Sequence, residues 1–357
     1  MSLLRIHVTE IIDGDQLIND IFNNYGLHVL SKGTKLYRKE VSRLLQHQID
    51  FVEIADREAG TDDDQKNRTL ESTVTPKWLP TVGPIYENAV NTFQQIFEQA
   101  LASGTVDDQQ VKAVTEPLLN NLQLERDVVS MLLLLNSHSS YTYQHSVQVC
   151  MLSYYLATWL GYSQKDAARI GQAGFLHDIG KCRIPESILN KPAKLTEEEF
   201  EEIKRHTVYG HEIIMSSFQD ELLAKAALQH HERMDGSGYP HGLKGDAIGP
   251  ISMIIAVVDI YSAMISARVY QKERDLLYVL RELYRLSFEQ LDPHTTHTFI
   301  KHMIPNFIGK KVRLNNDQYG IIVMTHPTDF FRPLIQIGDT FLDLTQEREY
   351  EIVHVYM

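Results

Sequence analysis

Apolar residues recur at helical spacing through most of the chain, from about residue 81 to residue 306. Between residues 143 and 160 they form one stripe whose members are three or four positions apart: His145, Val149, Leu152, Leu156 and Trp159. A stripe of this period covers one face of an α-helix, and an apolar face is normally buried. The sequence therefore predicts a mainly α protein with a large helical domain over residues 81–306.

Short apolar runs separated by turn residues flank this helical segment. Residues 1–55 combine alternating apolar positions with one helical stripe over residues 38–48, which predicts a small mixed α/β module with a regulatory or docking role. Residues 307–357 contain several short apolar runs and predict a small C-terminal β module. Residues 56–80 hold the polar stretch AGTDDDQKNRTLESTVTP, which is typical of a linker.

Composition and charge narrow the partners and the compartment. The 357 residues carry a formal net charge of -13, which disfavours general binding to nucleic acid polymers and to anionic membranes. The chain has two cysteines, nothing resembling a signal peptide, and no apolar run long enough for membrane insertion. We therefore expect a cytoplasmic protein.

Polar residues interrupt several of the apolar faces. Ser163 and Asp166 have the form of a capping box, and the helix that they open carries His177 and Asp178 at its end, where Gly180 is expected to stop it. Asp259 lies inside the apolar run MIIAVVDIYSAMI. A buried carboxylate is costly unless it is hydrogen-bonded or bound to a cation, so these positions indicate a functional site.

Three further histidines follow the same pattern. Thr196 and Glu199 form a second capping box, and the helix beyond them is expected to run through residue 213 with His206 on its apolar flank. The next helix, from about residue 220, leads into HHERMDGSGYP, which places His230 and His231 side by side. Neutral imidazole is the commonest protein ligand for transition metals, and this repetition predicts a metal site.

The motifs together resemble the HD-GYP domain, a branch of the HD metal-dependent phosphohydrolase superfamily. The resemblance rests on HSVQV from His145, HDIGK from His177, IKRHTVYG around His206 and HHERMDGSGYP from His230, and it covers about residues 125–305. It implies an HD-type helical bundle in a bacterial signalling enzyme that hydrolyses cyclic di-GMP. The expected products are the linear dinucleotide pGpG, GMP, or both, formed by attack of a hydroxide that bridges two metal ions.

The resemblance also implies roles for individual residues. The first metal ion would bind His145, His177, Asp178 and Asp259. The second would bind Asp178, His206, His230 and His231, so that Asp178 bridges the two ions. Iron or manganese is the expected metal. Lys181 and Arg268 would contact the phosphates, and Tyr239 would line the substrate groove. The Gly-Tyr-Pro loop suggests a cyclic di-GMP synthase as a partner, and a homodimer stays open.

Three departures from the family pattern concern this site. Tyr141 stands where some members have a glutamate that recruits a third metal, which favours two metal ions here. Ser262 stands where a second aspartate is common, and Gln271 replaces a lysine expected to contact the ligand. Two alternatives therefore accompany the phosphodiesterase: a non-catalytic effector that binds a cyclic dinucleotide or a protein, and a phosphohydrolase of another cyclic dinucleotide.

Overall fold

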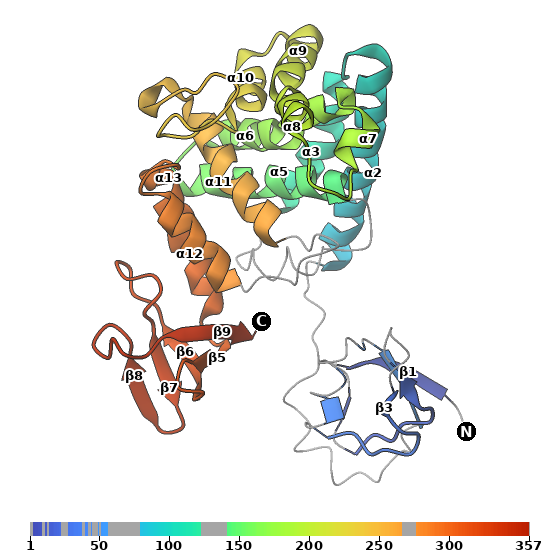
Figure 1. Ribbon diagram of the computed structural model, residues 1–357, viewed down its shortest axis with the longest axis vertical. Helices are drawn as coiled ribbons and strands as arrows, with labels where there is room; N and C mark the ends of the chain where they lie inside the picture. Colours follow the sequence, from blue (N-terminus) through green and yellow to red (C-terminus); the bar gives the residue numbers. More distant parts are fainter. Residues whose placement is uncertain are drawn as a thin grey trace. The chain divides into compact units, whose positions relative to one another are not determined.

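The helical periodicity of the central segment corresponds to a group of packed α-helices in the computed structural model (Figure 1). The structure describes residues 3–8, 11–12, 14–22, 28–37, 40–41, 44, 49, 51–55, 79–122, 141–265 and 276–356. The chain divides into two units, Met1–Val74 and Thr75–Met357. The predicted fold class, mainly α with small β parts, is confirmed. The linker expected over residues 56–80 lies almost entirely outside the described residues.

The N-terminal unit is built on short antiparallel strands. Strand β1 (Leu3–His7) pairs with β4 (Phe51–Ala55), and β2 (Ile21–Phe22) pairs with β3 (His28–Leu30). Nine of the described residues form a separate small buried core, among them Ile6, Leu17, Val29, Val52 and Ile54. The helix expected over residues 38–48 falls mostly outside the described residues.

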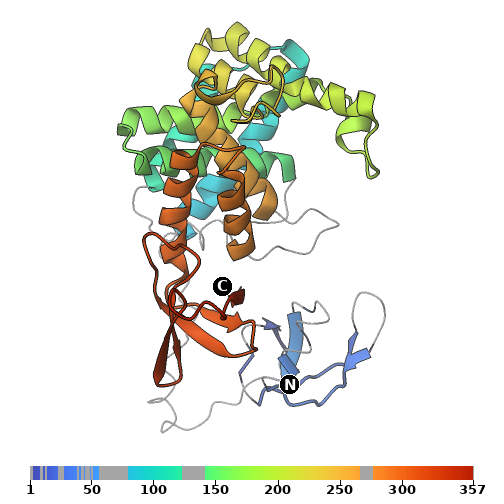
Figure 2. The same ribbon diagram turned by 60° about the vertical axis from the view of Figure 1, so that its left-hand side comes forward.

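The second unit begins with a group of packed helices, some of which carry the predicted site residues. They are α2 (Leu79–Ser103), α3 (Asp108–Leu122), α5 (Tyr141–Trp159), α6 (Gln164–Leu176), the 3-10 helix η2 (Ile179–Arg183), α7 (Glu186–Leu189), α8 (Glu197–Lys204), α9 (His206–Phe218), α10 (Glu221–Gln229), the 3-10 helix η3 (Gly245–Ala247), α11 (Pro250–Ile265), α12 (Leu276–Leu286), α13 (Pro293–Met303) and the 3-10 helix η4 (Ile304–Phe307). Helix α5 packs against both α6 and α11 (Figure 1 and Figure 2). The short helix η2 packs against α9. Among the described helices, none is long and apolar enough to cross a membrane.

The predicted capping residues begin their helices as expected. The Ser163 hydroxyl accepts from the Asp166 amide, and Thr196 and Glu199 form a complete capping box. The expectation of one continuous helix from residue 196 to residue 213 is wrong, because α8 ends at Lys204 and α9 begins at His206. At this break the His206 ring donates to the Ile203 carbonyl at 2.6 Å, so a side chain takes the place of a helical amide.

Gly180 has a different role from the predicted one. Helix α6 already ends at Leu176, and Gly180 lies inside η2 without a positive φ angle. A Cβ atom on Gly180 would lie 2.0 Å from the His206 carbonyl oxygen and 2.3 Å from the Gly210 nitrogen. The glycine is therefore required by the close approach of η2 to α9, which brings Asp178 and His206 together.

The C-terminal strands form one antiparallel sheet within the second unit. Strands β5 (Lys311–Leu314), β6 (Tyr319–Met324), β7 (Leu334–Ile337), β8 (Thr340–Asp343) and β9 (Ile352–Tyr356) lie in the order β8-β7-β6-β5-β9. The buried side chains of this sheet belong to the same apolar core as the helices. Tyr284 of α12 contacts Phe330 and Phe331 at ring-centroid distances of 6.2 and 5.7 Å, which attaches the loop before β7 to the helices.

We expect Gly180→Ala to destabilise the protein by more than about 3 kcal/mol, because the added methyl group meets backbone atoms that have no room to move. Gly210→Ala is the matched control on the other side of this contact. Its Cβ would approach the Ala227 Cβ at 3.3 Å, and alanine favours the helix, so a change within about 1 kcal/mol is expected. Urea unfolding of metal-free protein measures both values. Equal effects of the two substitutions would contradict this account of η2.

Candidate metal centre

The seven predicted metal ligands come from five segments and converge at the ends and buried faces of helices. His145 lies in α5, His177 and Asp178 join α6 to η2, His206 begins α9, His230 and His231 follow α10, and Asp259 lies in α11. All are buried except His231, whose side chain is 19% exposed. The structure therefore brings together every metal ligand that the sequence predicts.

The donor atoms form two groups. In the first, the Asp259 Oδ1 lies 3.0 Å from the His145 Nε2 and 3.9 Å from the His177 Nε2. The ligand atoms of these three residues all lie within 4.8 Å of one another. This spacing suits one metal ion held by two imidazoles and a carboxylate.

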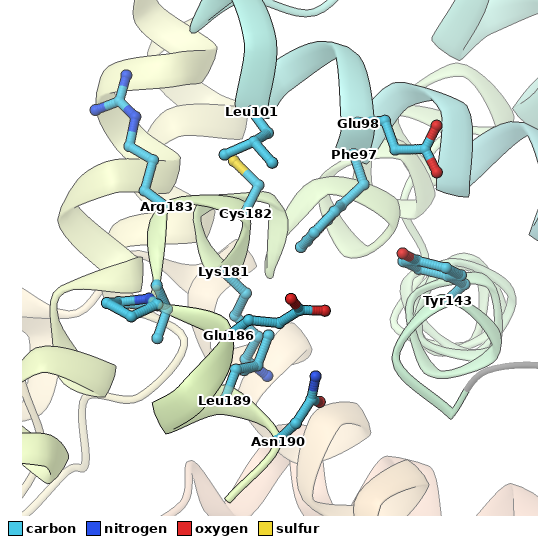
Figure 3. Close-up of a pocket in the computed structure, with 12 residues that line it drawn as sticks. Phe97, Glu98, Leu101, Tyr143, Lys181, Cys182, Arg183, Glu186, Leu189 and Asn190 are labelled. Carbon is cyan, nitrogen blue, oxygen red and sulfur yellow. The ribbon is translucent and has the colours of Figure 1, made fainter.

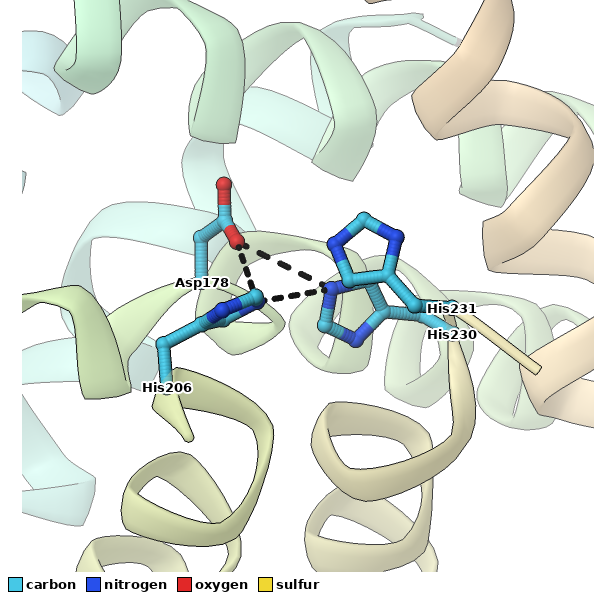
Figure 4. Close-up of side chains that lie close together, drawn as sticks. All are labelled: Asp178, His206, His230 and His231. Carbon is cyan, nitrogen blue, oxygen red and sulfur yellow. Dashed lines mark hydrogen bonds and ion pairs between the residues drawn. The ribbon is translucent and has the colours of Figure 1, made fainter. Parts of the chain in front are cut away.

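The second group consists of Asp178, His206, His230 and His231 (Figure 4). The Asp178 Oδ1 lies 3.3 Å from the His206 Nε2 and 3.7 Å from the His230 Nε2. The two Nε2 atoms of His206 and His230 are 3.3 Å apart. Two unprotonated ring nitrogens at this distance repel each other, so a cation between them is the natural complement.

Asp178 joins the two groups through its two carboxylate oxygens. While the Oδ1 faces His206 and His230, the Oδ2 lies 3.3 Å from the His177 Nε2 and 3.9 Å from the His145 Nε2. Asp259 makes a weaker connection, because its Oδ2 lies 3.9 Å from the His231 Nδ1. Such an arrangement would suit two neighbouring cations that share the Asp178 carboxylate.

Backbone carbonyls fix three of the histidine rings. In each case the Nδ1 donates to a carbonyl three residues earlier in the chain, at 2.6 to 2.8 Å: His177 to Gly174, His206 to Ile203 and His230 to Ala227. With the proton on Nδ1, the lone pair on Nε2 faces the two donor groups. This is the tautomer and orientation that metal-bound histidines require.

Electrostatics favour the metal-binding forms of His230, His231 and Asp178. For His177, burial lowers the pKa, but the neighbouring Asp178 and Asp259 carboxylates outweigh burial and raise it. Burial lowers the pKa of His231 to about 3, and burial together with the neighbouring imidazoles holds the pKa of His230 well below its usual range. For Asp178, burial alone would raise the pKa. The adjacent His177, the Lys181 ammonium and His206 together outweigh burial and hold the pKa of Asp178 well below its usual value. Neutral imidazole and ionised carboxylate are the forms that bind metal ions.

Two atoms in the centre lack a hydrogen-bond partner. Among the described residues, the His177 Nε2 and the Asp178 Oδ1 are buried and make no hydrogen bond. Buried polar atoms nearly always have a hydrogen-bond partner. A metal ion bound between these two atoms would supply the partner that each of them lacks. The donor set therefore fits divalent transition-metal ions.

The residues predicted to contact substrate lie at one edge of this centre. The Lys181 ammonium donates to the Asp178 Oδ2 at 2.5 Å, and its side chain is 24% exposed. The Tyr239 ring packs beside the His231 ring, with centroids 4.7 Å apart. Arg268 and Gln271 lie outside the described residues, as does the side chain of Tyr141.

Glu232 holds the loop that carries Tyr239. Its buried carboxylate accepts from the backbone amides of His241 and Leu243 at 2.8 and 2.9 Å, which closes the loop behind the histidine pair. Asp235, the other acid of this motif, accepts from Ser237 in a local turn on the surface. The buried acid of the motif therefore positions the loop.

A cavity of about 630 Å³ lies on the other side of Lys181 (Figure 3). The residues that line it come from α2, from the start of α5 and from the segment after Asp178: Phe97, Glu98, Leu101, Tyr143, Lys181, Cys182, Arg183, Ile184, Pro185, Glu186, Leu189 and Asn190. Apart from Lys181, no pattern in the sequence singles out these residues, because they belong to ordinary helical stripes or to short helices and turns.

Known proteins with similar sequences and folds indicate the family to which this site is related. The HD domain family matches residues 128–294. Residues 128–294 are thus similar to the HD domain family. The predicted resemblance to HD-GYP proteins is thereby confirmed. A solved structure from Bdellovibrio bacteriovorus, described as an HDG"Y"P protein, covers 84% of this chain and 98% of its own at a TM-score of 0.50 and 17% identity, which supports the fold.

Curated relatives of the HD domain carry more specific names. A cyclic di-GMP phosphodiesterase of Pseudomonas aeruginosa is 33% identical over 244 residues, covering 68% of this chain and 56% of that protein. One of Thermotoga maritima is 40% identical over 185 residues, half of each chain. A 3'3'-cGAMP-specific phosphodiesterase of Vibrio cholerae is 31% identical, covering 62% of this chain and 54% of its own. The chain thus spans about half the length of these relatives.

We expect the purified protein to bind about two manganese ions per chain. Asp178→Asn should abolish both sites, because its carboxylate faces both donor groups. His145→Gln and His206→Gln are the matched single-group variants, and each should retain one ion. Metal analysis by mass spectrometry after removal of free ions gives the stoichiometry. Retention of one ion by Asp178→Asn would show that the carboxylate belongs to a single site.

Proposed function

We propose that this HD domain is a metal-dependent phosphodiesterase that hydrolyses cyclic di-GMP. The observation that carries the proposal is the pair of donor groups joined by Asp178, with the Lys181 ammonium at the same carboxylate. Two divalent cations held this close would activate a water molecule and stabilise the negative charge of a phosphodiester under attack. Iron or manganese is the proposed metal, because imidazole and carboxylate ligands suit both.

The exposure of the ligands indicates where the phosphodiester would approach. His177, His206 and His230 are fully buried, whereas His231 and Lys181 are 19% and 24% exposed. We therefore place the scissile phosphate at the edge between His231 and Lys181. There the Lys181 ammonium would donate to a non-bridging oxygen, and the Tyr239 ring would form one wall of the groove.

The choice of nucleotide follows from the relatives. Those from Pseudomonas aeruginosa and Thermotoga maritima are named for cyclic di-GMP, which makes it the first substrate to test. The Vibrio cholerae relative is named for 3'3'-cGAMP, so a phosphodiesterase of that nucleotide is the second candidate.

Three further proposals follow from the resemblance to HD-GYP proteins. The products are pGpG, GMP or both. Arg268 is a further contact to the phosphate. The Gly-Tyr-Pro loop is the contact for a cyclic di-GMP synthase.

We expect anaerobically purified protein loaded with iron or manganese to cleave cyclic di-GMP, measured as pGpG and GMP by chromatography. Lys181→Met should lower kcat/KM by about 10²-fold without changing the metal content, because it removes one donor to the developing charge. Lys191→Met is the matched control, because Lys191 is 27% exposed and also pairs with a carboxylate, that of Glu199. It should leave kcat/KM unchanged.

The substrate panel for this assay contains cyclic di-GMP and 3'3'-cGAMP. Cleavage of 3'3'-cGAMP alone would keep the phosphodiesterase and change its substrate. Metal-loaded protein that binds cyclic di-GMP but leaves both nucleotides intact would reject the enzyme and favour the effector.

A further inference from the structure

His145 differs from the other buried histidines in what holds its ring. His177, His206 and His230 each donate from Nδ1 to a backbone carbonyl. The His145 Nδ1 instead lies 3.0 Å from the hydroxyl oxygen of Ser262, in α11. The orientation of this one ligand therefore depends on a side chain that a point mutation can remove.

Ser262 is in turn oriented by a second side chain. Its hydroxyl donates to the Gln148 Oε1 at 3.0 Å, and both residues are almost completely buried. Because the hydroxyl proton points toward Gln148, a lone pair of the Ser262 oxygen faces His145. In the metal-bound form, that lone pair would accept the proton on the His145 Nδ1, and the Nε2 lone pair would be free for the ion beside the Asp259 Oδ1, which lies 3.0 Å from Nε2.

The spacing along the two helices explains how the four residues meet. His145 and Gln148 are three positions apart in α5, and Asp259 and Ser262 are three positions apart in α11, so each pair shares one helix face. Helices α5 and α11 pack against each other, and the two faces meet. His145 and Asp259 are the candidate metal ligands of the two pairs. Ser262 contacts the far side of the His145 ring, and Gln148 contacts Ser262.

We infer that Ser262 and Gln148 position His145 for the first metal ion and set the affinity of that site. The inference rests on the proposed metal centre and concerns residues outside the ligand set. Partners that orient a metal-bound histidine usually change the metal affinity by about 10 to 100-fold when they are removed. Ser262 therefore acts through His145 and has no direct contact with a substrate in this account.

The test is a Mn²⁺ titration of metal-stripped protein, in which electron paramagnetic resonance measures the free ion. Ser262→Ala should weaken one of the two sites by about 10 to 100-fold and leave the other unchanged. Ser262→Thr keeps the hydroxyl and should restore the affinity. Gln148→Met, which removes the acceptor that orients the hydroxyl, should weaken the same site.

Ser252→Ala is the matched control. Ser252 lies in the same helix as Ser262, is 1% exposed, and its hydroxyl also contacts a glutamine amide oxygen, that of Gln229 at 3.3 Å. The Ser252 hydroxyl contacts the Lys225 carbonyl and the Gln229 amide oxygen rather than a histidine ring, so both Mn²⁺ sites should keep their affinities. Equal losses in Ser252→Ala and Ser262→Ala would mean that any buried hydroxyl of α11 affects metal binding, and would overturn the inference.

A double-variant comparison separates positioning from general destabilisation. In a His145→Gln background, Ser262→Ala should have no further effect on Mn²⁺ binding, because the residue through which it acts is absent. A further loss of affinity would overturn the inference. Unchanged affinity in Ser262→Ala, with two ions bound by the unaltered protein, would overturn it and leave the metal centre intact. Failure of the unaltered protein to bind Mn²⁺ would reject the centre and the inference together.

Discussion

The shared carboxylate of Asp178 is the feature on which the rest of the site depends. It is 2% exposed, and burying an ionised carboxylate costs several kcal/mol unless positive charge and hydrogen-bond donors surround it. Lys181 supplies one charge directly at its Oδ2, and four histidines lie within 4 Å of its two oxygens. The helices that meet at this point come from distant parts of the chain, so the site and the fold stabilise each other.

Backbone groups position several of these ligands. Breaks in the helical ladder free carbonyls that accept from imidazole nitrogens, as at Ile203 and Ala227. Gly180 removes the side chain that would keep η2 away from α9. His145 is held differently, by side chains of two packed helices, and it is therefore the ligand most open to change without disturbing the backbone.

The sequence was sufficient for the fold class, the helix-capping residues and the seven candidate ligands. The reason is physical: a histidine or aspartate on an apolar stripe stands out, and Ser163 and Thr196 carry their caps in the local sequence. The break at Arg205 and the role of Gly180 depend on contacts between segments about 30 residues apart, which no local pattern reveals. Ser262 stood out only as a departure from the family pattern. Its contacts with Gln148 and His145 were missed for the same reason, because they form only where α5 meets α11.

The most direct test of the shared carboxylate is a crystal structure of manganese-loaded protein, with the ions located by anomalous scattering. The account predicts two peaks: one among His145, His177, Asp259 and the Asp178 Oδ2, the other among His206, His230, His231 and the Asp178 Oδ1. A single peak, or two peaks of which only one is bound by Asp178, would contradict it.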